Sequence, residues 1–141
     1  MTPRRGFSLP ELLVALAIAA IVACCAVSSL RQAVRQTRRA AAAATLLELA
    51  TRQEAHRARH GRYAVDPAAL GWRGEADGSV PWPDAARSWY LLRLRATPGP
   101  FPGTNGYQAL ACPLGAQADD PCGCLGIDSS GRREPARPGC W

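Results

Sequence analysis

Three short groups of side chains in this 141-residue sequence have the types and spacings that chemistry requires. His56 and His60 are four residues apart in a segment of helix-forming composition, the spacing that lets two imidazoles share one helix face and chelate a metal ion. Asp119-Asp120 offers two adjacent carboxylates to a cation. Cys122 and Cys124, separated by one glycine, offer two thiols for redox or metal chemistry.

Each of these groups lacks the further partners that a reactive site needs. No third ligand follows the histidines at a matching distance, and Arg57 and Arg59 flank them, so we interpret them as surface residues. We interpret the acid pair as solvated loop carboxylates, and the two thiols have no second pair at metal spacing. The sequence contains no Ser/His/Asp or Cys/His set and no glycine-rich phosphate loop. We therefore expect no enzyme activity, no metal and no cofactor.

The element around which the chain is built is the apolar run Phe7–Leu30. It has 24 residues, and Glu11 is its only carboxylate or base. A helix of this length reaches about 36 Å, enough to cross the hydrocarbon core of a bilayer. The apolar core of a cleaved secretory signal is shorter, about 7–15 residues. The run therefore predicts a retained membrane helix.

Glu11 is costly in such a helix. Insertion scales put an acid at the helix centre at about 2.5–3.5 kcal/mol, unless it is paired or protonated. Either Glu11 lies near the interface, where this cost fades, or it has a cationic partner. The free α-amine created by a cut after Gly6 would serve, on the same helix or on a neighbouring one.

The N-terminal residues resemble a known processing signal. Arg4-Arg5-Gly6, followed by Phe7-Ser8-Leu9-Pro10-Glu11 and an unbroken apolar run, resembles the class III signal of type IV pilins and pseudopilins. The resemblance implies that a prepilin peptidase cuts after Gly6 and methylates the new amine of Phe7. It also implies that Glu11 pairs with that amine on a neighbouring subunit during assembly. Pro10 would fall in the first turn of the mature helix, where its missing N–H breaks no bond.

Charge and length divide the chain into four parts: a leader at 1–6, a membrane and assembly helix at 7–30, an amphipathic helix at 31–62, and a head at 63–141. The 79 residues of the head are few for a core, so covalent bridges would help it. Net charge is +6, and all of this excess lies in the amphipathic segment, which contains eight arginines and two acidic residues. Such a segment can contact anionic lipid or acidic neighbours. Because the head is not basic, a nucleic-acid function is less favoured.

The cysteines separate into two sets. Cys24 and Cys25 lie in the apolar run, where we interpret them as small buried hydrophobic residues, with lipidation as the minor alternative. Cys112, Cys122, Cys124 and Cys140 lie in the last thirty residues, which indicates disulfides and an oxidising compartment. The arginines after the apolar run would instead place the head in the cytoplasm. We give the leader and the cysteines more weight and expect a periplasmic head on an inner-membrane anchor, and an extracellular pilus after assembly.

The fold class expected is α+β, with a long N-terminal helix packed on a small antiparallel sheet of about 3–4 strands. Leu46, Leu49, Ala50 and Gln53 form the apolar stripe, and Gly61 is the helix stop. Tyr63–Pro83 is expected to be a loop whose Leu70, Trp72 and Trp82 cover the stripe. Alternation predicts a strand at Ser88–Ala96 with Tyr90, Leu92, Leu94 and Ala96 facing the helix. Further strands are expected at Tyr107–Leu114 and Cys122–Asp128.

The C-terminal segment resembles minor pilins of the PilE type, which end in a short meander closed by a disulfide and a terminal Cys-Trp. That resemblance implies a Cys122–Cys140 bridge, which would stabilise the fold by about 3 kcal/mol in the chain-entropy model. Cys112 and Cys124 are extra to the pattern and either form a second bridge or remain free. Four cysteines allow three pairings, and the sequence does not choose among them.

The resulting hypothesis is a structural minor pilin of a type IV pilus. Its partners would be other pilin subunits, the prepilin peptidase, the inner-membrane assembly machinery and the membrane, and it would support pilus biogenesis, twitching motility or adhesion. One alternative is a pilus-borne DNA receptor for DNA uptake that uses Arg93 and Arg95, or Arg132, Arg133 and Arg137. The other is a type II secretion pseudopilin, with which the terminal Cys-Trp agrees less well.

Overall fold

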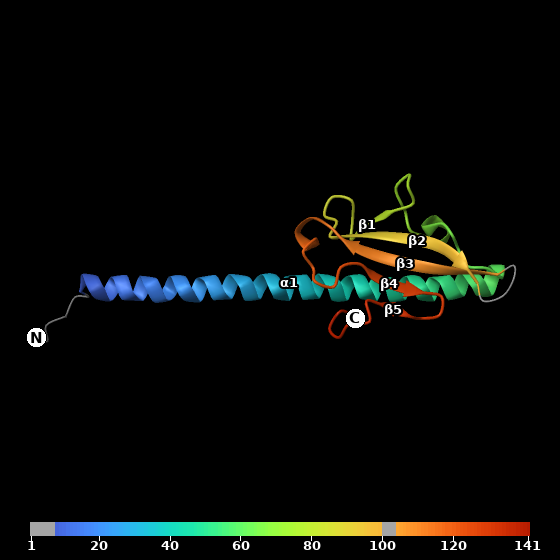
Figure 1. The fold of residues 1–141 in the computed structure, drawn as a ribbon. Coiled ribbons are helices and arrows are strands. Elements are labelled where there is room, and N and C mark those ends of the chain that lie inside the picture. Colours follow the sequence, from blue (N-terminus) through green and yellow to red (C-terminus); the bar gives the residue numbers. More distant parts are fainter. Residues whose placement is uncertain (1–7, 100–103) are drawn as a thin grey trace, which may run out of the picture. The chain divides into compact units, whose positions relative to one another are not determined.

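The structure is a computed structural model that describes residues 8–99 and 104–141 (Figure 1). Contacts divide the chain into two units, residues 1–36 and residues 37–141, which are described in turn. The elements of the described residues are, in chain order, α1 Leu9–His60, η1 Pro67–Leu70, β1 Val80–Trp82, β2 Tyr90–Pro98, β3 Asn105–Pro113, η2 Gly115–Gln117, β4 Leu125–Asp128 and β5 Arg133–Glu134.

The first unit is the N-terminal part of α1. The helix begins at Leu9, and Glu11 lies in its first turn. Its most apolar 18-residue window has a mean hydropathy of 2.6 and is not buried within the chain. By length and composition it is apolar enough to cross a membrane. The expected leader, including Gly6, and Phe7 lie outside the described residues.

In the second unit, α1 supplies one face of the core. Its buried residues are Ala42, Ala43, Leu46, Leu49 and Gln53. This is the predicted stripe extended by one turn toward the N-terminus, with Ala50 only partly buried. The helix ends at His60, and Gly61 has a φ of 71° and donates its N–H to Arg57 O at 2.8 Å. A left-handed glycine at this position ends a helix without steric cost, so the predicted stop is confirmed.

The sheet packs on this stripe as an antiparallel meander with the strand order β1-β2-β3-β4-β5. In Figure 1 it lies along the part of α1 that precedes His60. The buried side chains of its inner face are Tyr90, Leu92, Tyr107, Ala109, Ala111, Leu125 and Ile127. Tyr90 and Leu92 thus face the core as predicted. Ala96 is exposed instead. β1 pairs with β2 only as far as Leu92, so beyond that residue β2 is itself the edge of the sheet.

Two short edge strands add to the three strands that the sequence indicated. β1 lies inside the segment expected to be a loop, because Pro81 favoured a loop over a strand in the sequence. Proline is tolerated in an edge strand, where no partner needs its N–H. The expected strand at Cys122–Asp128 is shorter, since β4 starts only at Leu125. The preceding residues form a turn in which Gly123 has a φ of 61°, so the prediction that the strand begins at Cys122 was wrong.

Candidate functional site

The C-terminal region is held by two disulfides. Cys122 is joined to Cys140, the pair that the resemblance implied, with their Cα atoms 5.7 Å apart. Cys112 on β3 is joined to Cys124 with a Cα–Cα distance of 4.0 Å, so the two extra cysteines form a second bridge. The last residues of the chain are thereby tied to the turn that precedes β4.

A buried ion pair fastens the same region to α1. Arg39 Nε lies 3.1 Å from Asp120 Oδ2, and the two side chains are 14% and 0% exposed. Arg39 Nη1 also donates to Gly139 O at 2.8 Å and lies 2.9 Å from Cys122 Sγ. One guanidinium therefore contacts the acid, the disulfide and the backbone beside the C-terminus.

Asp120 is the centre of a buried polar network. It accepts hydrogen bonds from Gln117 Nε2 at 2.7 Å, Tyr90 Oη at 3.1 Å and the N–H of Cys122 at 3.0 Å. Burial alone raises the pKa of this carboxyl, but the hydrogen bonds from Cys122, Gln117, Tyr90 and Arg39 together lower it below its usual value. Burial also raises the pKa of Tyr90 to about 12.

This network corrects the interpretation of Asp119-Asp120 as solvated acids, because Asp120 is buried. Arg39 entered the sequence analysis only as one of the eight arginines of segment 31–62. A weak signal was present: Gln117 and Asp120 stand three residues apart directly before the cysteine pair, in a segment otherwise rich in small residues.

The histidine pair and the cysteines of the apolar run, the other candidates for chemistry, are not part of the Asp120 network. The rings of His56 and His60 lie 4.3 Å apart, and His56 Nδ1 is 2.9 Å from Arg62 O. Within residues 8–99 and 104–141, no group of three or more His, Cys, Asp or Glu side chains is placed to hold a metal ion. Cys24 and Cys25 are free and exposed on the apolar part of α1.

The five arginines proposed for DNA lie in two places. Arg93 and Arg95 are exposed on β2 and line one hollow together with Asp66, Glu75 and Asp77. Arg132, Arg133 and Arg137 are exposed on the C-terminal segment.

Known proteins resemble this chain along most of its length. The profile of the family described as type IV minor pilin ComP, DNA uptake sequence receptor, matches residues 28–126. The profile of the prokaryotic N-terminal methylation motif matches residues 1–23. A solved type IV pilin from Shewanella oneidensis is 29% identical, with 76% of this chain and 97% of that chain covered and a TM-score of 0.55. Among curated proteins, none matches this sequence.

A long N-terminal helix packed on an antiparallel meander, together with a methylation motif at the N-terminus, defines a type IV pilin. The ComP profile spans more than half of the chain, and the chain belongs to that family of type IV minor pilins. The predicted pilin fold and the predicted minor-pilin role are confirmed. Both the matched minor-pilin family and the similar solved structure are type IV pilins, which favours that role over a type II secretion pseudopilin.

Proposed function

We propose that this minor pilin is displayed on the pilus surface as a receptor for double-stranded DNA. The observation that carries the proposal is the match of residues 28–126 to a family described as a DNA uptake sequence receptor. A DNA receptor needs exposed cations, because contacts with the phosphate backbone supply much of the affinity.

The C-terminal arginines suit this task better than those on β2. The Arg132 side chain is 73% exposed, and its ion pairs within the described part of the chain are long, at 3.6 Å to Asp128 and 3.9 Å to Glu134. Arg133 stacks on the Trp141 ring, with its guanidinium carbon 5.5 Å from the ring centroid. The disulfide Cys122–Cys140 ties down the backbone that carries these cations before DNA arrives.

The β2 pair has three acidic neighbours, one more than the two that lie beside Arg132. Asp66, Glu75 and Asp77 line the same hollow as Arg93 and Arg95, so carboxylates outnumber guanidinium groups there. Arg93 also helps to lower the pKa of Asp77, after the larger effect of the Ser79 hydrogen bonds. A phosphate backbone approaching this hollow would meet net negative charge.

The test is salt-dependent binding of a labelled 20-base-pair duplex to the full chain in nonionic detergent. Arg132→Gln should weaken binding to every sequence and reduce the slope of log K against log salt by about one. Arg93→Gln is the matched control and should leave the slope unchanged. Absence of binding at low salt would remove the proposal, and a slope that falls only with Arg93→Gln would move the site to β2.

We also propose how the subunit reaches the pilus. The peptidase cuts between Gly6 and Phe7, methylates the new amine, and releases a subunit held by the 7–30 helix with its head in the periplasm. Glu11 then pairs with the amine of a neighbouring subunit, which offsets the cost of a carboxylate in apolar surroundings. The first turn of α1, where Glu11 stands exposed, suits such a contact. The assembled subunit is structural rather than enzymatic and supports pilus biogenesis, twitching motility or adhesion.

Two measurements test this route. Replacing Gly6 with a bulky residue should leave the leader attached, seen as an unshifted intact mass. Glu11→Ala should leave cleavage intact and reduce the share of the protein found in pili, and normal incorporation would contradict the pairing.

A further inference from the structure

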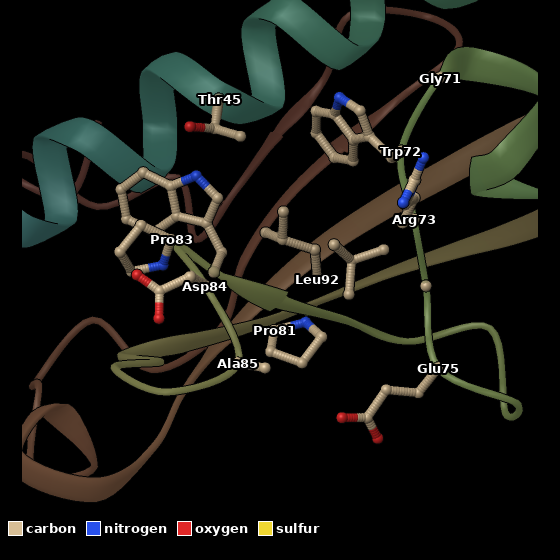
Figure 2. Close-up of a pocket in the computed structure, with 13 residues that line it drawn as sticks. Thr45, Gly71, Trp72, Arg73, Glu75, Pro81, Pro83, Asp84, Ala85 and Leu92 are labelled. Carbon is tan, nitrogen blue, oxygen red and sulfur yellow. The ribbon is translucent and has the colours of Figure 1, made fainter.

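A hollow of about 520 Å³ lies beside the edge strand β1, next to Thr45 of α1 (Figure 2). Trp72, Trp82 and Leu92 contribute its large apolar surfaces. Its volume lies within the range of about 300–1,000 Å³ that is usual for ligand sites. Figure 2 shows the Trp72 indole near Thr45, and Leu92 below both.

The aromatic walls of this hollow are held in place before any partner arrives. Trp82 packs edge-on against Trp89, with ring centroids 6.2 Å apart and planes at 74°. Arg38 of α1 stacks on the other ring, 4.4 Å from the Trp89 centroid. The backbone that carries Trp72 is held by its N–H, which donates to Pro67 O at 3.1 Å. A preformed site loses little entropy on binding.

The charged residues of the hollow favour a cation. Glu75 and Asp84 line it against Arg73 alone, and Figure 2 shows the two acids on opposite sides of Leu92. Within residues 8–99 and 104–141, neither acid forms an ion pair within 4.0 Å. Asp84 uses Oδ1 to accept the N–H groups of Ala86 and Arg87, and none of the described residues donates to its second oxygen. A polyanion such as DNA is disfavoured here.

The chain itself indicates which cation fits an indole. Trp89, Trp141 and Tyr63 each carry an arginine guanidinium stacked on the ring, at 4.4, 5.5 and 5.1 Å from the centroid. Trp72 and Trp82 have no such partner among the described residues. A planar guanidinium can stack on an indole while its edge pairs with a carboxylate, which an ammonium cannot do equally well.

We propose that this hollow receives an arginine side chain of a neighbouring pilin subunit in the assembled pilus. The guanidinium would stack on Trp72 or Trp82 and pair with Asp84 or Glu75. The site is at an outer edge of the sheet, since β1 pairs only with β2, so a neighbouring head can reach it. The inference depends on the family assignment and not on DNA binding.

The direct test places a photo-activated cross-linking residue at Ala85, an exposed position on the rim, in the full chain assembled into pili. The matched control carries it at Ala116, which is exposed on η2. We expect Ala85 to cross-link to a pilin subunit within a few residues of an arginine, and Ala116 not to join the same segment. Cross-linking to DNA, to lipid or to a pilin segment without arginine would overturn the proposal, as would no cross-link at Ala85.

Variants in the hollow give the second measurement. Asp84→Asn with Glu75→Gln keeps the Oδ1 acceptor but removes both charges, and Trp82→Leu removes one stacking face. We expect each to lower the Ala85 cross-link yield at least fivefold, while Glu48→Gln on exposed α1 leaves it unchanged. DNA affinity should not change in any of them, which separates this proposal from the receptor function. An unchanged cross-link yield in the double charge variant would overturn it.

Discussion

Replacing Arg39 with methionine should be one of the most destabilising single changes on α1. The variant keeps most of the apolar stem but removes the only guanidinium within 4.0 Å of Asp120 among the described residues. Losing one member of a buried ion pair costs about 3–5 kcal/mol, because the other charge stays buried. Hydrogen bonds from Tyr90, Gln117 and Cys122 still reach Asp120, so we place the loss at about 3 kcal/mol. For a unit of this size the melting temperature should fall by about 12–24 °C.

The assay is thermal unfolding of the full chain in detergent, followed by near-ultraviolet circular dichroism under non-reducing conditions. Arg59→Met is the matched control, because the Arg59 side chain is exposed and, among the described residues, bonds only to Ala55 O. Its stability should stay within about 0.5 kcal/mol of that of the original chain. Arg39→Met with Asp120→Asn should lose less than the sum of the single changes, since neither charge is left unpaired. If Arg39→Met changed stability by less than about 0.5 kcal/mol, the ion pair would not be what fastens the C-terminal region to the helix.

Three further predictions concern the same unit. The pKa of Asp120 is lowered in the folded state, so its contribution to the free energy of unfolding is complete above the unfolded pKa of about 4 and is lost as pH falls below it. Asp120→Asn should therefore make stability depend less on pH in the acid range, and an unchanged dependence would contradict this. Gln53→Ala should cost about 2–4 kcal/mol, measured by chemical unfolding, because the buried N–H and C=O of Ala64 each lose a 2.9 Å partner. Replacing Cys122 and Cys140 together with serine should cost about 3 kcal/mol, and a loss below about 1 kcal/mol would show that the bridge constrains little.

The sequence by itself determined the parts of this protein that depend on local pattern. The length of the apolar run, the isolated Glu11 and the basic leader indicate a pilin before any fold is known, because a membrane span and a processing signal are linear features. The helix stop at Gly61 and the inward positions Tyr90 and Leu92 followed from local conformation and alternation. Apolar periodicity decides which face is buried where a neighbouring element covers that face, as it does at Tyr90 and Leu92 but not at Ala96.

Only the tertiary structure decided the contacts between residues far apart in the chain. Arg39 and Asp120 are 81 positions apart, and nothing in either segment indicates that they meet. The pairing of Cys112 with Cys124 follows from β3 lying beside the turn before β4, which cysteine spacing does not encode. The hollow lined by Trp72 and Trp82 exists because the segment after η1 and the edge strand β1 carry their indoles to the same part of α1. These features depend on which surfaces pack together, and packing is a property of the whole chain.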